Sequence, residues 1–320
     1  EISMRLVFAH DHIFKKDKFG NYYTAGSFNN DVWKRYLKHF DEVIVIARLD
    51  SKPVEKENKY NKFNLKNCSF QPIPSLSGPI TQFKNRSLAK TIIKNKLIEA
   101  DALIARLPSE IGNLAIDVAN ELGKPYAIEV VACVWDALWN YGSIQAKIYA
   151  PIAMYKMKKR VKNSPYTLYV TNKFLQKRYP SNGESVSVSN VEIAEVSDKC
   201  LEARLKKIRS KSRLSKIGMI GNLNNRIKGW DTAIRALEIL AENNIDFELH
   251  ILGDGNKTRW EKIAKELDVN NKVFFHGVLP SGGPVFKWLD DIDIYIQPSF
   301  QEGLPRAVIE AMSRGCPVIG

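Results

Sequence analysis

Short, nearly unbroken apolar runs alternate with longer helix-like segments from one end of this chain to the other. The runs at 43–48 and 126–131 are rich in Val, Ile and Ala rather than alternating with polar residues, which indicates strands buried on both faces of a parallel sheet. Segments between such runs, for example 229–243, carry apolar residues on one face at a period near 3.6. This alternation predicts an α/β fold with doubly wound parallel sheets. The expected strands are 5–9, 43–48, 102–105, 126–131, 167–170, 186–189, 216–220, 248–252, 272–275, 293–297 and 317–319.

The strand pattern is interrupted once, at 191–214, where a polar start is followed by a charge-dense helical pattern over 198–213. We therefore expect two Rossmann-like domains, 1–190 and 215–320, joined by this connector and facing each other across a cleft. Ligands of such sheets bind beyond the carboxyl ends of the strands, so the functional residues should lie in the loops that follow strands. Because Gly320 alone follows the last expected strand, where a crossover helix would be normal, we expect the C-terminal domain to be incomplete.

The composition is that of a water-soluble globular protein, with 44% hydrophobic and 26% charged residues. No apolar run reaches the eighteen or so residues that a membrane-spanning helix needs. The first five residues lack the architecture of a signal peptide. The four cysteines are scattered and fit neither a metal-ligand spacing nor a disulfide framework. These features favour a cytoplasmic protein.

The positive charge is concentrated in one stretch. The net charge is +13, and residues 151–213 hold 15 Lys and Arg against 5 Asp and Glu. Such an excess suits nucleic acid, an anionic membrane surface or a phosphorylated substrate, or it forms a solvated basic face. The overlapping segment 144–161 is a basic amphipathic pattern, which could rest on a membrane or pack its apolar side in the core. Its apolar residues include Ile148, Ile152, Tyr155 and Met157.

Two glutamates flank the start of a helix near the C-terminus. Glu302 lies in the loop after expected strand 293–297, and Glu310 lies about one and a half turns into the next helix. Gly303 permits close backbone approach, and Pro305 starts a helix whose free N–H groups can hold an anion. Each carboxylate could accept hydrogen bonds from vicinal hydroxyls, one pair on a sugar and one on a ribose. Alternatively, Glu302 caps the helix and Glu310 is solvated.

Two more loops follow strands in the same half. The first begins at Gly221 and ends with Arg226 and Lys228 before Gly229. Cations at this place can neutralise a diphosphate. The second loop starts at Gly253, but it lacks the third glycine of a dinucleotide-binding fingerprint.

Together, segments 221–231, 251–255 and 298–320 resemble the donor-binding half of the family 4 retaining glycosyltransferases (glycosyl transferases group 1), which have the GT-B fold. In that family the first glutamate holds hydroxyls of the donor sugar, and the amides beside it support the sugar and the diphosphate. The second glutamate binds the ribose, and the lysine of the Lys-Gly pair binds phosphate. The resemblance assigns these roles to Glu302, Gly303 with Leu304, Glu310 and Lys228, with Gly221, Gly253 and Pro305 beside them.

One position departs from the family pattern. The family usually has arginine directly after the glycine that ends the first strand of this half, and this chain has Asn222 there. We expect Arg226, four residues further on, to supply the missing cation.

The N-terminal half matches the family less specifically. The resemblance implies a glycine-containing loop that reaches the donor phosphates, for which Gly26 is the candidate, with Ser27 as a phosphate ligand. The alternative is an ordinary helix start capped by Ser27 or Asn29. On the acceptor side the candidates are polar residues near strand ends, each of which could equally be a structural anchor. They are His10, with Asp11 and His12 beside it, Glu129 and Asp136.

The resemblance implies retaining transfer of a sugar from a UDP- or GDP-sugar to a hydroxyl of a glycan or lipid-linked glycan in cell-surface polysaccharide synthesis. Residues 1–190 would bind the acceptor and 215–320 the donor, with an anionic membrane surface as a further partner and no nucleic acid. The protein would lie in the cytoplasm or at the inner face of the membrane. We expect no cofactor and no metal, because Asp291-Ile292-Asp293 precedes a strand rather than following one. A catalytically silent GT-B scaffold, and an epimerase or phosphorylase of the same fold, stay as alternatives.

Overall fold

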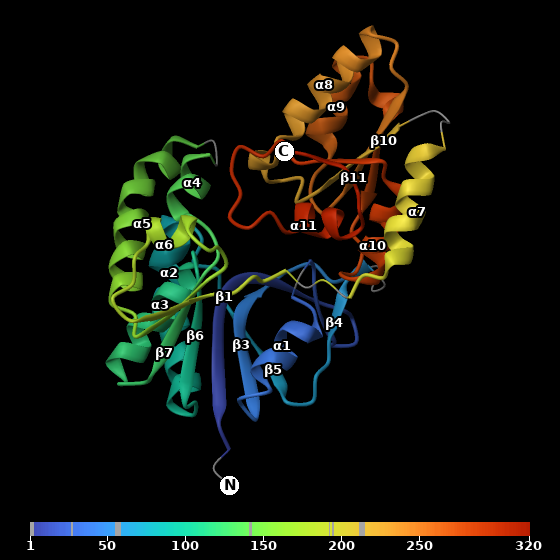
Figure 1. Ribbon diagram of the computed structural model, residues 1–320. Coiled ribbons are helices and arrows are strands. Elements are labelled where there is room, and N and C mark those ends of the chain that lie inside the picture. Colours follow the sequence, from blue (N-terminus) through green and yellow to red (C-terminus); the bar gives the residue numbers. More distant parts are fainter. Residues whose placement is uncertain are drawn as a thin grey trace. The chain divides into compact units, whose positions relative to one another are not determined.

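The computed structural model describes residues 3–26, 28–54, 59–140, 143–191, 193, 195–210 and 215–320 (Figure 1). The chain divides into two compact units, the first made of 1–134 with 151–189 and the second of 135–150 with 190–320. Each unit contains an open sheet of mostly parallel strands with helices on its faces, as the alternation of apolar runs predicts.

The sheet of the first unit has seven parallel strands among the described residues, in the order β5, β3, β1, β6, β7, β8, β9. Two short strands, β2 and β4, extend it antiparallel from the far half of β1. The strands are β1 (Arg5–Lys16), β2 (Tyr22–Thr24), β3 (Glu42–Leu49), β4 (Asn61–Phe63), β5 (Cys68–Ile73), β6 (Ala102–Leu107), β7 (Tyr126–Val130), β8 (Tyr166–Tyr169) and β9 (Glu184–Ser187).

Both faces of this sheet are buried. Consecutive β1 residues Val7 and Phe8 are both fully buried, although they point to opposite faces. On one face Phe8 packs against Trp33 of α1, with 5.3 Å between ring centroids. The helices of this part of the chain are α1 (Asn30–Tyr36), α2 (Pro79–Ile98), α3 (Glu110–Glu121), α4 (Val134–Trp139), α5 (Ile144–Lys162) and α6 (Phe174–Arg178).

β1 is longer than the sequence pattern indicates. It continues past Ala9 to Lys16, with an irregularity in its pairing to β3 between Ala9 and Ile13. The prediction that His10 ends the first strand is therefore wrong, because extra residues at a bulge let a strand bend and continue pairing. The far half pairs with Tyr22–Thr24, which is not among the expected strands. β5 was not predicted because its polar residues and a proline suit an edge strand.

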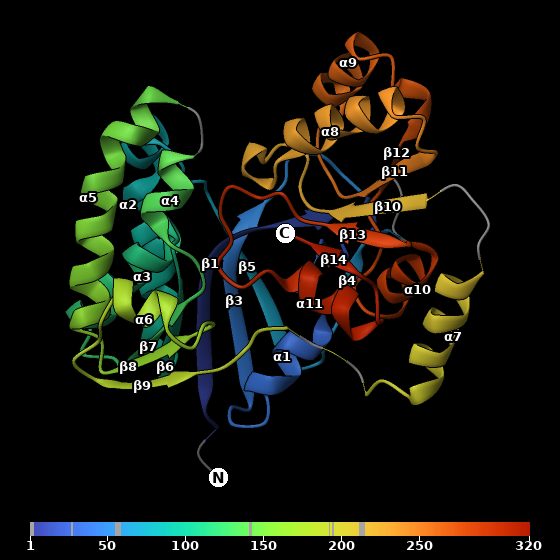
Figure 2. The ribbon, with the colours of Figure 1, turned by 45° about the horizontal axis from the view of Figure 1, so that its top comes forward.

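The sheet of the second unit is parallel throughout its described strands, in the order β12, β11, β10, β13, β14. The strands are β10 (Ser215–Ile220), β11 (Phe247–Leu252), β12 (Val273–Gly277), β13 (Ile294–Ile296) and β14 (Val318–Ile319). Helices α8 and α9 cover one face, and α10 and α11 cover the other (Figure 2). They span α8 (Trp230–Glu242), α9 (Thr258–Glu266), α10 (Gly283–Asp291) and α11 (Arg306–Ser313).

The strand order of this sheet reverses between β10 and β13. Crossovers on the two sides of that point lie on opposite faces, which opens a crevice at the carboxyl ends of the two strands. The loops after β10 and β13 carry Lys228 and Glu302, so the fold brings the predicted donor residues to this crevice.

The helix expected in the connector 191–214 is α7 (Asp198–Arg209), and it is fastened to the second unit. Its Arg204 is 4% exposed and donates to the backbone carbonyls of Leu289 (2.8 Å), Arg314 (3.2 Å) and Ile292. The end of the expected helix, at 211–213, lies outside the described residues. None of the helices in the described ranges combines the length and apolarity that a membrane span needs.

Candidate functional site

Three loops meet at the carboxyl edge of the second sheet. The amide of Gly221 donates to the carbonyl of Leu252 (3.0 Å), which joins the loop after β10 to the end of β11. The amide of Phe300 donates to the carbonyl of Ile227 (2.9 Å), which joins the loop after β13 to the short helix η2 (Arg226–Lys228). These backbone bonds hold the cation-bearing loop against the glutamate-bearing loop.

Two glycines make this contact between loops possible. Gly229 has φ +75°, and a Cβ on it would lie 1.9 Å from the carbonyl oxygen of Pro298. A Cβ on Gly253 would lie 1.7 Å from the carbonyl oxygen of Gly221. Both distances are far below van der Waals contact, so only glycine fits at either position. The close backbone approach that the glycines of this region predict is therefore an approach of one loop to another.

Lys228 and Glu302 form the centre of the site. Lys228 Nζ donates to Glu302 Oε1 at 2.6 Å, and both side chains are slightly more than one-fifth exposed. The same oxygen accepts from Ser299 Oγ (2.7 Å) and Gln297 Nε2 (3.0 Å). Within the described residues, the second oxygen of Glu302 accepts no hydrogen bond, and it can therefore take hydroxyl donors from a ligand.

Behind Glu302, a hydrogen-bonded chain runs into the core. Gln297 is 6% exposed, and its side-chain carbonyl accepts from Tyr295 Oη at 2.5 Å. The amide of Ile220, at the end of β10, donates to the same hydroxyl at 3.3 Å. Burial raises the pKa of Tyr295 above its usual range, so the phenol stays neutral. This series of hydrogen bonds holds Glu302 in position relative to β10 and β13.

The helix after Glu302 begins without a side-chain cap. The residue before α11 is Pro305, which supplies no side-chain cap, so Glu302 is not the cap of this helix. The amides of Gly303 and Leu304 donate to no acceptor in the described part of the chain. Such N–H groups at a helix start can hold an anion or a hydroxyl.

Glu310 lies on α11 and is half-buried. Burial raises the pKa of its carboxyl above the ordinary value, and Arg306, one turn earlier, opposes that rise. No described residue donates a hydrogen bond to this carboxylate. The side chain is therefore neither fully solvated nor paired, which contradicts the alternative of a glutamate on an outer face.

Arg226 and Asn222 have different roles in the loop after β10. The side chain of Arg226 is exposed on η2 and makes no ion pair with a described residue. Asn222 Oδ1 accepts from the amide of Asn224 (2.9 Å), and its carbonyl accepts from the indole of Trp230 (3.3 Å). Asn222 thus shapes the loop, while Arg226 is a cation available to a ligand.

In the first unit, two acceptor-side candidates converge on Arg106, at the end of β6. His10 Nδ1 lies 3.3 Å from the carbonyl of Arg106, and Glu129 Oε2 lies 3.7 Å from its Nε. Glu129 is 9% exposed and also accepts from the Tyr36 hydroxyl. Asp136 lies in the first turn of α4, within the segment 135–150 that belongs to the second unit.

The histidines of β1 surround Phe28 and stay neutral. The ring centroid of His12 lies 4.4 Å from that of Phe28, and the Arg106 guanidinium lies 5.0 Å from it on the ring face. Burial, with Arg106 and Arg48 close by, lowers the pKa of His12 to about 3. Burial likewise holds the pKa of His10 well below its ordinary value. Neither ring carries a charge near neutral pH.

The loop that holds Gly26 ends in an ordinary helix cap, the alternative given above for this segment. Asn29 caps α1, because its side chain accepts from the amides of Asp31 (3.0 Å) and Val32 (3.2 Å). Gly26 has φ +64°, and its carbonyl accepts from Asn61 Nδ2 at 2.7 Å. Ser27 lies outside the described residues.

Comparison with known proteins now identifies the family. Residues 215–320 match the family described as glycosyl transferases group 1. The chain is also 34% identical over 318 residues to Protein CapJ of Staphylococcus aureus, an alignment that covers 99% of this chain and 78% of CapJ. The chain belongs to the group 1 glycosyltransferases.

Solved structures confirm the GT-B fold. The glycosyltransferase superimposes on WaaG, described as a glycosyltransferase involved in lipopolysaccharide biosynthesis, with a TM-score of 0.62 and 14% identity, over 98% of this chain and 80% of WaaG. It superimposes on HepE of Anabaena, solved in complex with UDP and glucose, with a TM-score of 0.61 and 14% identity, over 98% and 80% of the two chains. At this identity the likeness concerns the fold alone.

Several residues of the glycosyltransferase that support the site were missed from sequence. Gln297 and Ser299 bond Glu302, and Arg106 joins the two acceptor-side candidates. Their sequence signal is their position at or just after the end of an expected strand, and Ser299 also lies in the segment 298–320 that resembles the family. Asp291 and Asp293, the pair that looked like a metal motif, are ion-paired to lysines of β10 and α7 respectively.

Proposed function

We propose that this glycosyltransferase moves a sugar from a UDP- or GDP-sugar to a hydroxyl acceptor, with retention of anomeric configuration and without a metal. The observation that carries the proposal is the contact between Lys228 and Glu302 at the reversal point of the second sheet. A cation for the diphosphate and a carboxylate for the sugar hydroxyls lie side by side there, next to the amides of Gly303 and Leu304, which no described acceptor binds.

The difficult part of the reaction is negative charge that grows on the departing diphosphate. Fixed cations and helix-start amides stabilise this charge more strongly in the transition state than in the ground state. Lys228 is held in place by Glu302, and the exposed Arg226 is two residues before it on η2. The carboxylate of the half-buried Glu310 accepts no hydrogen bond from a described residue, which suits a ribose diol. The departing phosphate would help to deprotonate the acceptor.

For the acceptor, we propose a glycan or lipid-linked glycan of a cell-surface polysaccharide. The description of WaaG, a glycosyltransferase involved in lipopolysaccharide biosynthesis, supports this, and HepE, solved with UDP and glucose, supports a UDP-sugar as donor. The first unit, with its buried group around Arg106, would supply acceptor contacts.

The test is a binding and hydrolysis screen of the purified chain against UDP-, GDP- and ADP-sugars. We expect slow hydrolysis of one donor class and its loss in Glu302→Ala. Glu266→Ala, on an exposed turn of α9, is the matched control and should hydrolyse like the wild type. No binding to any donor would contradict the proposal and favour a silent scaffold; wild-type rates in Glu302→Ala would contradict the assigned site.

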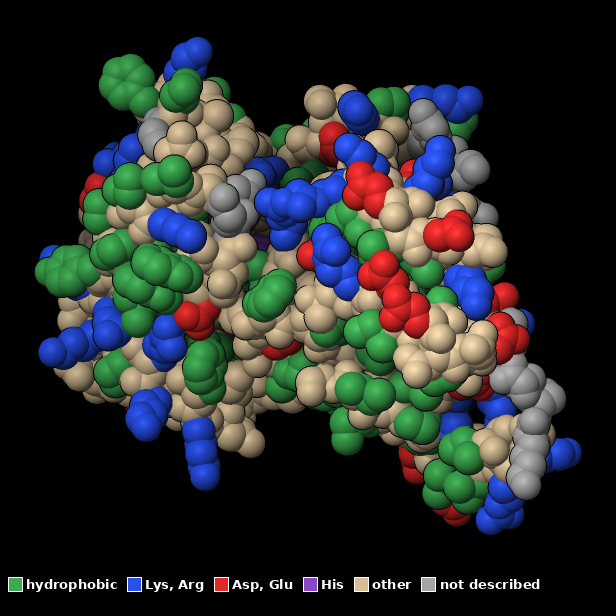
Figure 3. Space-filling model, turned by 90° about the horizontal axis from the view of Figure 1, so that it is seen from above, with side chains coloured by type: hydrophobic (Ala, Val, Ile, Leu, Met, Phe, Trp, Pro, Cys, Tyr) green, Lys and Arg blue, Asp and Glu red, His purple; other side chains and the backbone are tan. Residues whose placement is uncertain are grey.

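We also propose that helices α2 and α5 contact an anionic membrane from the cytoplasmic side. The two helices hold eleven Lys and Arg and no Asp or Glu. Both bond Asp117 of α3, through Arg86 of α2 (3.4 Å) and Arg160 of α5 (2.7 Å). Phe83 of α2 is 92% exposed, and Figure 3 shows hydrophobic and basic side chains intermingled at the left, where these helices lie. The exposed apolar residues of these helices within the first unit are Ile80, Phe83, Leu88, Ile98, Ile152 and Tyr155.

One residue of the predicted apolar face does not belong to it, because Met157 is buried in the core. Exposed apolar side chains among lysines are the composition of a surface that binds anionic lipid. Co-sedimentation with vesicles of phosphatidylglycerol and phosphatidylcholine tests the contact. We expect binding that falls with salt and weakens in Phe83→Ser, whereas Ile239→Ser, an exposed change on α8, should bind normally. No binding at low salt would remove this part of the proposal.

A further inference from the structure

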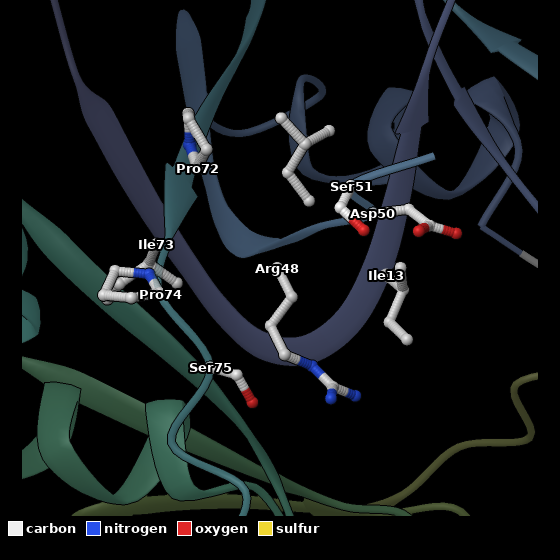
Figure 4. Close-up of a pocket in the computed structure, with 9 residues that line it drawn as sticks. Ile13, Arg48, Asp50, Ser51, Pro72, Ile73, Pro74 and Ser75 are labelled. Atoms are coloured by element: carbon white, nitrogen blue, oxygen red, sulfur yellow. The ribbon is translucent and has the colours of Figure 1, made fainter. Parts of the chain in front are cut away.

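An open cavity of about 500 Å³ lies in the first unit, at the carboxyl ends of β3 and β5 and beside the far half of β1 (Figure 4). Its volume falls within the range of small-molecule sites, roughly 300–1,000 Å³. The cavity is lined by residues of one unit only, and none of them belongs to the predicted donor site. Carboxyl ends of parallel strands are where ligands of such sheets bind.

Arg48, at the end of β3, is held rigidly in the wall of this cavity. Its Nε and Nη2 donate to the carbonyl of Asp11 at 2.8 and 2.6 Å. Its Nη1 donates to Ser77 Oγ at 3.2 Å. A guanidinium has five N–H groups, so two remain for a ligand while the side chain is already fixed.

Asp50 supplies a fixed acceptor in the same wall. Its carboxylate is paired with Lys15 Nζ at 2.8 Å and accepts from the amide of Lys52 at 3.1 Å. Although burial acts in the opposite direction, these two contacts lower the pKa of Asp50, so it is ionised at neutral pH. Ser51 and Ser75 add hydroxyl groups, and Pro72 and Pro74 add apolar surface.

The combination of groups selects one class of ligand. Asp50, although paired with Lys15, still has carboxylate lone pairs to accept with, and Arg48 has N–H groups to donate with, so a polyhydroxyl compound can donate to the one and accept from the other. The proline rings offer apolar surface to the C–H faces of such a ligand. Arg48 also binds Asp11, the residue after His10, so the cavity adjoins the group around Arg106.

We propose that this cavity binds a neutral saccharide of the acceptor, with Arg48 and Asp50 as specificity-determining residues. The assignment to the acceptor rests on the proposed transferase function. The saccharide could belong to a free glycan or to a lipid-linked one, since both present the same hydroxyls.

The test is glycan binding by the full chain, measured with an array of neutral di- to tetrasaccharides and with the same glycans carrying an octyl chain. We expect a subset of glycans to bind, and Asp50→Asn and Arg48→Met to lose about tenfold or more in affinity, because each removes a hydrogen bond to a charged group. Ser51→Trp blocks the cavity at an exposed position and should act in the same way. Glu99→Gln, in a second cavity of about 500 Å³ at the opposite end of α2, is the matched control and should bind normally.

Thermal unfolding of each variant shows whether it is folded, and Ser51→Trp keeps the test informative if Arg48→Met is unstable. Equal loss with free and octyl glycans supports recognition of the saccharide itself. Absence of glycan binding by the wild type, binding only through the octyl chain, or unchanged affinity in folded cavity variants would overturn the cavity proposal. Glycan binding that depends on Arg48 and Asp50, without hydrolysis of any nucleotide sugar, would instead contradict the transferase function.

Discussion

Lys228 Nζ lies 2.6 Å from Glu302 Oε1, although 74 positions separate the two residues in the chain. They meet because β10 and β13 are neighbours in the second sheet and each is followed by one of the two loops. The contact keeps a cation and a carboxylate in place at the predicted donor site. A donor diphosphate would compete with Glu302 for Lys228.

The ion pair predicts coupled effects of substitution. We expect Glu302→Ala to lower the transfer rate by at least about a hundredfold, and Lys228→Ala to impair both donor binding and turnover. Because the side chains touch, the double variant should lose less than the sum of the single losses. A double-mutant cycle on kcat/KM measures the coupling, with the exposed pair Lys257 and Glu261 at the start of α9 as a control cycle. Additive losses would argue against a shared role.

Close packing of the two loops predicts a large cost for a methyl group at Gly229. Gly229→Ala adds a Cβ 1.9 Å from the Pro298 carbonyl at a φ of +75°, so we expect a loss of about 3 kcal/mol or more in stability. Gly283→Ala, where a Cβ meets no atom within 4 Å, should stay within about 0.5 kcal/mol. Urea unfolding compares the two variants. Similar midpoints would show that the loops are not in contact.

Glu310 predicts a conflict between stability and ligand binding. Burial raises its pKa, so its contribution to stability is complete below the unfolded value of 4.5 and is lost as pH rises through the folded value. We therefore expect Glu310→Gln to become more stable relative to the wild type between pH 4 and pH 7, while its affinity for the donor falls. Thermal unfolding across this pH range and donor titration measure the two effects. A relative stability that declines with rising pH would have the wrong sign.

His12 predicts acid sensitivity of the first unit. Its pKa is about 3 in the fold and near 6.5 when unfolded, so stability present above pH 6.5 is lost as pH falls toward the folded value. At pH 5 the loss should reach about 2 kcal/mol, because each unit of pH below 6.5 costs about 1.4 kcal/mol. His12→Phe keeps the ring beside Phe28 and removes the titration.

Hydrogen exchange of β1 amides at pH 7 and pH 5 compares the wild type with this variant. We expect protection in the wild type to fall more steeply with acid than in His12→Phe. His39→Gln, in an exposed turn, controls for the loss of a histidine. An equal loss of amide protection in the wild type and in His12→Phe would contradict the assignment of the acid sensitivity to His12.

Parts of the fold with local sequence signals were predictable. Parallel strands buried on both faces leave continuous apolar runs, so the sequence indicated all five strands of the second sheet and the central strands of the first. β2, β4 and the far half of β1 carry no such signal. Their pairing depends on partners distant in sequence, and strand propensity is set largely by those neighbours.

The sequence by itself determined the α/β class, the helix start after Glu302 and the placing of Lys228 and Glu302 after strands, because these depend on periodicity and on nearby residues. Only the tertiary structure decided that Lys228, Gln297 and Ser299 all donate to one oxygen of Glu302, and that His10 and Glu129 meet at Arg106. Those contacts follow from strand order and register, which arise from long-range packing that no local pattern records.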